Sequence, residues 1–284
     1  MTLASSSSAA ALTHAELIVA VAFAALCTTY AVSSPFFGNP RQAAWILTTI
    51  VSLLMTAVSA PYVVAYLQGG VRNLVQRPEL DVPLNRGFQA YLLADLIVGC
   101  LHYRSQITFL TGWLHHILYL GICEFVIRQR WTHIFALCAV MELPTFLLGL
   151  GTLFPRLRSY RLFAFSFFIT RIVLHLILLY TYLLPANRPD GSLAPVLLLT
   201  AVFPLHALWF TKCVKGMRRR ARERRLARKY HTSRWTRIRM RVGRWVSGRR
   251  PIRARSIRMA RRMSDKLTRA LPSKESMMEL VGMA

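Results

Sequence analysis

Ionisable side chains lie near the middle of several long apolar stretches of this 284-residue sequence. A charged side chain at the centre of a bilayer costs at least ~2.5–3.5 kcal/mol even on insertion scales, so such residues are functional candidates by default. They persist most easily where they pair around a shared polar interior. The residues that we expect to converge in this way are Asp95, His115, His116, Glu142, Arg171 and His175, with Ser52 and Tyr119 completing the polar lining.

Adjacent histidines and a lone arginine give this set its chemical possibilities. His115 and His116 could work as nucleophile and base, because neutral imidazole accepts protons readily near pH 7. Arg171 has two natural ion-pair partners, Glu142 and Asp95. The alternative is that these side chains only hold helices together, since buried polar contacts in membranes can be worth about 0.6 kcal/mol each. That structural role suits any single residue, but for the set as a whole we predict a functional pocket.

Seven apolar stretches are long enough to carry these residues across a bilayer, whose apolar core of roughly 30 Å needs about 20 residues of helix. Of all residues 54% are hydrophobic, yet the formal net charge is +26. The two facts agree because 25 of the 37 Lys and Arg residues lie from Lys212 onward. We therefore predict an all-α integral membrane protein with a basic tail and with helices over 15–33, 43–67, 88–107, 108–127, 131–154, 160–184 and 193–213.

Prolines interrupt three of the predicted helices. Each proline lacks a backbone N–H and so frees the carbonyl four residues earlier, which protein or water must satisfy inside a membrane. Simple kinking for packing is the alternative for each proline. The prolines and the carbonyls that they free are Pro61 with Ala57, Pro144 with Val140, and Pro204 with Thr200.

The last 73 residues carry too many charges to bury a core. Ten basic residues between Lys212 and Lys229 predict a cytosolic C-terminus, and seven spans then place the N-terminus in the lumen. Within the tail, apolar residues recur at helical spacing over 233–247, which predicts an amphipathic helix on an anionic membrane surface. A solvated charge run that only fixes topology is the alternative. Nucleic acid is not expected, because the lipid surface is the nearer polyanion.

The N-terminus and the cysteines suggest no processing or metal chemistry. No basic residue precedes the first apolar run, so an uncleaved helix is expected, although Ala31-Val32-Ser33 resembles a cleavage site and keeps cleavage as an alternative. The five cysteines are scattered through apolar stretches without CxxC spacing. They are therefore interpreted as small buried hydrophobes, and no metal or resident cofactor is predicted.

Five short motifs occur along the chain in an order shared with a known family. They are Val51-Ser52-Leu53-Leu54, Tyr91-Leu92-Leu93-Ala94-Asp95, Leu114-His115-His116-Ile117, Glu142-Leu143-Pro144-Thr145 and Phe167-Phe168-Ile169-Thr170-Arg171. In these motifs the chain resembles the TLC domain of the TRAM proteins and the ceramide synthases. The resemblance covers residues 40–215, which leaves 1–39 as an N-terminal segment with the first helix and 216–284 as a largely disordered tail.

The resemblance implies six helices in a barrel around a polar, lipid-accessible cavity, in a multi-pass protein of the endoplasmic reticulum membrane. In ceramide synthases the matching histidine pair supports acyl transfer from acyl-CoA. This chain lacks the acidic motif that follows the pair in those enzymes, and it has Met55 and Pro144 where relatives often keep His and Ser. Ceramide synthesis is therefore not the expected activity.

Two functions from different classes follow. The first is lipid handling, meaning binding of membrane lipids, acyl transfer with acyl-CoA as substrate, or control of membrane lipid composition. The second is a non-enzymatic regulator or cargo receptor of the early secretory pathway that uses its basic tail. A small-solute transporter is less favoured, because the sequence has no duplicated pair of broken helices.

Overall fold

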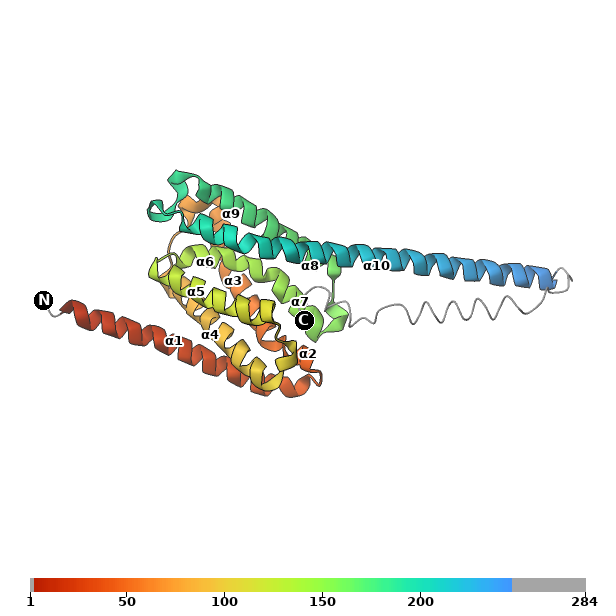
Figure 1. Ribbon diagram of the computed structural model, residues 1–284, viewed down its shortest axis with the longest axis horizontal. Coiled ribbons are helices and arrows are strands. Elements are labelled where there is room, and N and C mark those ends of the chain that lie inside the picture. Colours follow the sequence, from red (N-terminus) through yellow and green to blue (C-terminus); the bar gives the residue numbers. More distant parts are fainter. Residues whose placement is uncertain (1–2, 247–284) are drawn as a thin grey trace. The chain divides into compact units, whose positions relative to one another are not determined.

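The computed structural model describes the backbone of residues 3–246 and, within that range, the side chains of residues 16–109, 112–228, 230 and 236–242. Every regular element in the described part of the chain is helical (Figure 1). The chain divides into two compact units, of which the first ends at Phe210 and the second begins at Thr211.

Five helical segments of the described residues are long and apolar enough to cross a membrane, which supports the predicted all-α membrane class. Seven crossings do not follow from length and composition alone. The predicted helices 88–107 and 108–127 both contain helix but fall outside this group. The first carries many polar residues, and the helix His115–Arg128 of the second is only 14 residues long. The five segments are Glu16–Phe36, Pro40–Asn73, Thr132–Leu153, Tyr160–Leu183 and Ala194–Arg228.

Local sequence signals set several helix ends. The Asn39 side chain accepts a hydrogen bond from the Arg41 amide at the start of α2, and Gly70 leaves α3 with φ of 68°. The main helices are α1 (Leu3–Ser33), α2 (Pro40–Ala43), α3 (Ile46–Gly69), α4 (Pro78–His102), α5 (His115–Arg128), α6 (Thr132–Cys138), α7 (Leu143–Leu153), α8 (Tyr160–Phe167), α9 (Leu174–Leu183) and α10 (Ala194–Val246).

Helix α4 begins earlier than predicted, at Pro78 and not near residue 88. Pro78 stands in the first turn, where its missing N–H costs nothing, and Glu79 and Asp81 place negative charge at the positive end of the helix. These signals lie in a polar stretch that the sequence analysis assigned to a loop.

Short irregular segments divide two of the predicted helices. A 3₁₀ segment, η5 (Ala139–Glu142), separates α6 from α7, and a π-helical segment, η7 (Phe168–Val173), separates α8 from α9. A second π-helical segment, η4 (Phe109–Leu114), precedes α5. π-Helical turns often mark functional positions.

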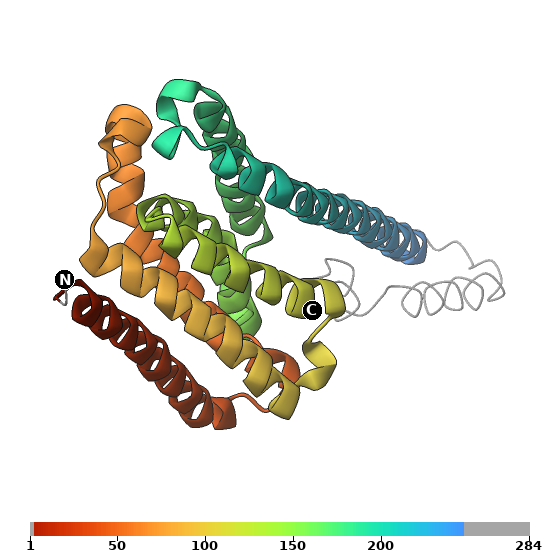
Figure 2. The same ribbon diagram turned by 60° about the vertical axis from the view of Figure 1, so that its left-hand side comes forward.

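Helix α3 is central to the first unit, because it packs against α4, α6, α7 and η5. Its buried residues Ile46, Leu47 and Met55 form one apolar cluster with Leu92 of α4. Helix α1 packs mainly against α4, and the two helices lie side by side in both ribbon views (Figures 1 and 2). Half of its described side chains are exposed, and of those described only Tyr30 is buried.

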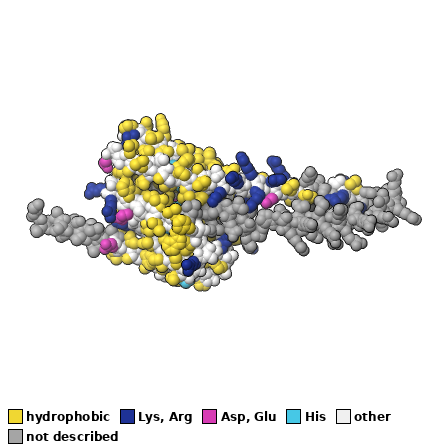
Figure 3. Space-filling view, viewed as in Figure 1, with side chains coloured by type: hydrophobic (Ala, Val, Ile, Leu, Met, Phe, Trp, Pro, Cys, Tyr) yellow, Lys and Arg dark blue, Asp and Glu magenta, His cyan; other side chains and the backbone are white. Residues whose placement is uncertain are grey.

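Apolar side chains also cover much of the surface of the first unit. They form broad patches over the visible face in the space-filling view (Figure 3). Exposed apolar residues occur on several helices, for example Leu54 of α3, Ile97 of α4, Ile117 of α5 and Tyr180 of α9. This surface is typical of a protein whose surroundings are apolar, since soluble monomers rarely expose large contiguous apolar patches.

The second unit, as far as it is described, is the continuation of α10 to Val246. Residues 216–232, which were expected to belong to a largely disordered tail, are therefore helical in the structure, and so are residues 233–246 of the predicted amphipathic helix. Arg, Lys and Leu favour helix, so a run rich in them can continue an existing helix. Of the predicted amphipathic segment 233–247, the side chains of Ile238 and Val242 are exposed, whereas those of Trp235 and Trp245 lie outside the described residues, as does everything from residue 247 onward.

A close crossing of α3 and α7 at Gly149 gives a test of the packing. A Cβ atom at Gly149 would overlap the Thr49 hydroxyl and press on the Trp45 ring. We expect Gly149→Ala to lower the thermal unfolding temperature of the detergent-solubilised protein, because overpacking typically costs about 1–3 kcal/mol. Gly121→Ala in α5 is the control, since a Cβ there meets nothing within 4 Å. Equal unfolding temperatures for the two variants would contradict the close crossing.

Candidate functional site

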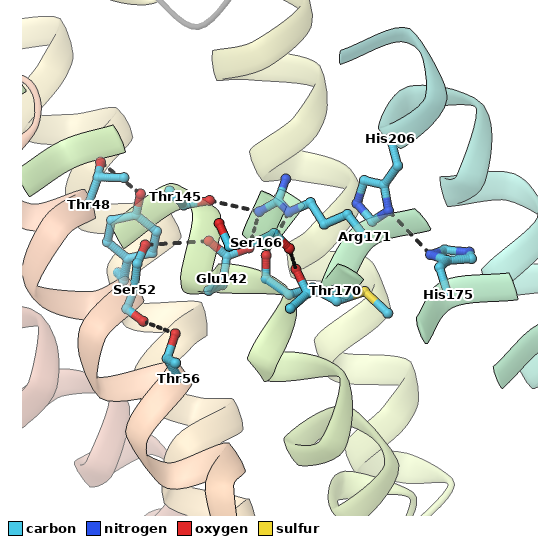
Figure 4. Close-up of polar contacts among 12 residues, drawn as sticks. Thr48, Ser52, Thr56, Glu142, Thr145, Ser166, Thr170, Arg171, His175 and His206 are labelled. Atoms are coloured by element: carbon cyan, nitrogen blue, oxygen red, sulfur yellow. Dashed lines mark hydrogen bonds and ion pairs between the residues drawn. The ribbon is translucent and has the colours of Figure 1, made fainter. Parts of the chain in front are cut away.

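A buried ion pair joins the two irregular segments η5 and η7. Arg171 Nη2 donates to Glu142 Oε1 at 2.8 Å and to Thr145 Oγ1 at 2.7 Å (Figure 4). Arg171 is 4% exposed, whereas the Glu142 side chain keeps 21% of its surface accessible. Of the two carboxylates that the sequence offered to Arg171, the structure therefore selects Glu142.

The backbone around Pro144 explains why this pair forms. A proline cannot donate to the carbonyl four residues earlier, and the chain passes through the 3₁₀ segment η5 immediately before it. Arg171 Nε donates to the Met141 carbonyl of this segment at 2.6 Å. The carbonyl that Pro144 was expected to free is that of Val140, one residue away. Arg171 itself lies in the π-helical segment η7.

Aromatic rings enclose the guanidinium. The Arg171 Cζ atom lies 5.4 Å from the centroid of the Phe167 ring and 5.6 Å from that of Trp209, distances typical of cation–π contacts. On the other side of the pair, Ser52 Oγ donates to Glu142 Oε2 at 3.4 Å. Trp209 was not among the residues predicted for the site, because an isolated aromatic residue in an apolar helix gives no signal in the sequence.

A second buried pair links α4 and α5. His116 Nε2 lies 3.1 Å from Asp95 Oδ2, and Tyr103 donates its hydroxyl to Asp95 Oδ1 at 2.8 Å. His116 Nδ1 lies 2.7 Å from the carbonyl of Gly112 in the π-helical segment η4. Tyr103 therefore joins the predicted set, although no role was expected for it from the sequence.

The two ring nitrogens of His116 have different contacts. A carbonyl oxygen can only accept, so Nδ1 carries a hydrogen toward Gly112. Nε2 lies close to Asp95 Oδ2, but the geometry is not that of a directed hydrogen bond. The two contacts together fix the orientation of the imidazole ring between η4 and α4.

His115 has a different environment from its neighbour. Its ring lies 4.5 Å from the Tyr119 ring and 5.8 Å from the Trp209 ring, measured between centroids. Its Nδ1 atom is buried and has no hydrogen-bond partner. Trp209 therefore contacts both His115 and Arg171, and through it the histidine pair and the ion pair belong to one cluster.

A third group of polar residues lies between α9 and α10. His175 Nδ1 and His206 Nδ1 are 3.2 Å apart, and both side chains are buried. His175 Nε2 lies 2.9 Å from the Leu199 carbonyl, one residue before the carbonyl that Pro204 was expected to free. Figure 4 shows His206 beside Arg171, which places the third group next to the ion pair.

A buried carboxylate that the sequence analysis missed lies near the start of α4. Asp81 is 0% exposed and accepts hydrogen bonds from Thr132 Oγ1 at 2.7 Å and from the Arg77 amide at 2.8 Å. One turn later, Asn85 is also fully buried, and neither of its amide atoms has a partner. Asp81 was overlooked because it was assigned to a loop.

Among the side chains that the structure describes, no three His, Cys, Asp or Glu residues are placed to hold a metal ion. The contacts of the cluster instead suit hydrogen bonding, proton transfer or nucleophilic attack by a free imidazole.

Comparison of the chain with protein-family models, curated proteins and solved structures finds no match. The resemblance to the TLC domain therefore remains a prediction from the motifs.

The ion pair can be tested by removing one partner and then both. We expect Arg171→Leu to destabilise the protein by about 3–5 kcal/mol, because it leaves Glu142 without its cation. Arg171→Leu/Glu142→Leu should be less harmful than the single change, since no unpaired charge remains. Thermal unfolding in detergent measures both.

The control for this series is the more accessible Arg86–Glu124 pair, whose Nη1–Oε2 distance is 2.7 Å. Arg86→Leu should cost less than Arg171→Leu, because Glu124 is more accessible than Glu142 and keeps Arg128 as a second cationic partner. A double variant no more stable than Arg171→Leu would show that the pair is not an isolated electrostatic unit.

Proposed function

We propose that this protein binds a membrane lipid at the polar cluster inside its helical bundle and acts there on an acyl group. The observation that carries the proposal is the convergence of Asp95, His115, His116, Glu142 and Arg171 from separate elements. Charged side chains in apolar surroundings are costly, and a set that meets in one place is typical of a functional site. The apolar outer surface supports a substrate that arrives from the bilayer.

The two histidines suit different tasks in this reaction. His116 is held by Gly112 and Asp95, so its role is to position and to carry a proton. His115 has a buried Nδ1 without a hydrogen-bond partner, whereas its Nε2 is not among the buried atoms, so Nε2 is the candidate nucleophile or base. In acyl transfer its nitrogen would attack the thioester carbonyl of acyl-CoA, the CoA thiolate would leave with a proton, and the acyl group would pass to an acceptor hydroxyl or amine.

Mass spectrometry of the purified protein after incubation with oleoyl-CoA tests this chemistry. We expect a covalent oleoyl adduct that maps to His115 and is absent from His115→Ala. His102→Ala, which changes an exposed histidine of α4, should retain the adduct. A co-purifying lipid without any adduct would limit the function to binding, and the absence of both would contradict the proposal.

We also propose seven membrane spans, including α4 and α5. The polar residues of these helices, Asp95 and His116, face other helices. Their outward faces carry apolar side chains, namely Leu93, Ile97 and Leu101 on α4 and Ile117 and Leu118 on α5. A helix with an apolar outer face and a polar inner face suits a bilayer even when its mean hydropathy is modest. The basic residues after Lys212 favour a cytosolic C-terminus.

The position of the α4–α5 connection distinguishes seven spans from five. In a cysteine-free background, Ser105→Cys should react with a membrane-impermeant maleimide only from the cytosolic side of sealed vesicles. Gln129→Cys, at the other end of α5, should react only from the opposite side. Both native residues are exposed, so the labels can reach them. Labelling of both positions from one side would exclude α4 and α5 as spans.

A second candidate function rests on the basic helix. In the second unit, α10 continues to Val246 with exposed apolar residues Ile238 and Val242 among arginines. Such a helix suits an anionic membrane surface. In a regulator or cargo receptor it would be the cytosolic segment through which the protein binds its partners. Placement in the endoplasmic reticulum follows from the resemblance to the TLC domain.

A further inference from the structure

The guanidinium of Arg171 is only partly engaged. It carries five N–H groups, of which one on Nε is donated to Met141 and two on Nη2 to Glu142 and Thr145. Among the described residues, no partner accepts from the two N–H groups of Nη1. In Figure 4 the corresponding nitrogen points away from Glu142 and Thr145, and no contact is drawn to it.

A guanidinium N–H without an acceptor is unfavourable in apolar surroundings, so a ligand oxygen that reaches this nitrogen gains hydrogen bonds. The Arg171 side chain as a whole is buried, with 4% exposed, but Nη1 is not among the fully buried atoms that lack a partner, so a ligand atom can reach it. Its other contacts hold the guanidinium rigidly between Phe167 and Trp209. Nη1 is therefore a fixed donor and not a mobile side-chain end.

The charges around Arg171 determine what kind of oxygen fits. Arg171 and Glu142 neutralise each other, and Asp95 beside His116 adds a further carboxyl group to the cluster. A carboxylate or phosphate would add an uncompensated negative charge in apolar surroundings, which is costly. A carbonyl oxygen accepts the same two hydrogen bonds without adding charge.

The position of this donor matches the candidate nucleophile. Trp209 contacts both the Arg171 guanidinium and the His115 ring. Arg171 is also close enough to His115 and Tyr119 for its charge to act on both. Glu142, His115 and Tyr119 each keep some accessible surface, so a ligand atom can approach this part of the cluster.

We infer that Arg171 Nη1 binds the carbonyl oxygen of a lipid acyl group, whether the lipid is an ester or a thioester. This inference rests on the proposed function, which it deepens by naming the recognised group. Arg171 thereby discriminates acyl lipids from alkyl lipids of the same shape, and the apolar rings of Phe167 and Trp209 line the place where the chain begins.

The test compares ligands that differ only in the carbonyl. The probes are dioleoyl phosphatidylcholine against its ether-linked counterpart, and oleoyl-CoA against its thioether analogue, each bound to the full-length protein in neutral detergent. We expect the wild type to bind the acyl member of at least one pair roughly tenfold more tightly, since a hydrogen bond to a charged group has about that worth. The pair that shows the preference identifies the source of the acyl group.

Two variants assign this preference to Arg171. Arg171→Lys keeps the charge and can still pair with Glu142, but it lacks the planar fork that orients Nη1. Arg171→Gln/Glu142→Gln removes both charges and avoids an unpaired carboxylate. Both should bind acyl and alkyl probes equally. Arg86→Gln/Glu124→Gln is the matched control for removing an Arg–Glu pair, and it should retain the wild-type preference.

The outcomes separate this inference from the proposed function. Equal binding of acyl and alkyl probes by the wild type would overturn the inference. It would mean that water accepts the hydrogen bonds from Nη1, whereas the proposal that the protein binds lipid would stand. A preference that survives in both Arg171 variants would also overturn it. If no probe binds, the lipid-handling proposal fails together with the inference.

Discussion

The cost of placing charge in apolar surroundings is the constraint on which the rest of this structure depends. Arg171 cannot remain in such a place alone, and its pairing with Glu142 stabilises both groups only because further hydrogen bonds complete the site. The pair ties η5 to η7, and Ser52 extends it to the central helix α3. Helix packing and the candidate site are therefore not separable, since the same contacts serve both.

Irregular backbone segments lie next to several of the buried ionisable side chains. In a regular helix each carbonyl accepts from a backbone amide, so a break in the pattern leaves acceptor capacity that a side chain can use. Three ionisable residues each contact a carbonyl in or near an interruption: Arg171 that of Met141 in a 3₁₀ segment, His116 that of Gly112 in a π-helical segment, and His175 that of Leu199 near Pro204. The interruptions in this bundle thus hold the polar residues in fixed orientations. Simple kinking does not account for all three.

The sequence allowed us to predict the helices and the polar residues of the site, but not which of these residues pair with each other. Long apolar stretches predicted the helices, and the intramembrane position of Arg171 predicted that it would pair. The choice between Glu142 and Asp95 was open, because it depends on the rotation of each helix, which spacing alone does not determine. Asp81 was missed because Pro78 and Glu79 resemble a loop as much as a helix start. The helical course of residues 216–232 was missed because charge density was taken as a sign of disorder, although arginine-rich segments favour helix once a helix has begun.

The adjacent histidines show how geometry gives neighbouring residues of one type different chemistry. Successive residues on a helix point about 100° apart, so two neighbours cannot face the same partner. The ring of His116 turns toward Asp95 on α4, and the ring of His115 turns toward Trp209 on α10. The pair is therefore not a dyad in which one imidazole activates the other through a shared hydrogen bond. The His116 ring is held by the Asp95 carboxyl group and the Gly112 carbonyl. The His115 ring has no hydrogen-bond partner at Nδ1, and it lies near Arg171, whose Nη1 has two N–H groups without an acceptor among the described residues.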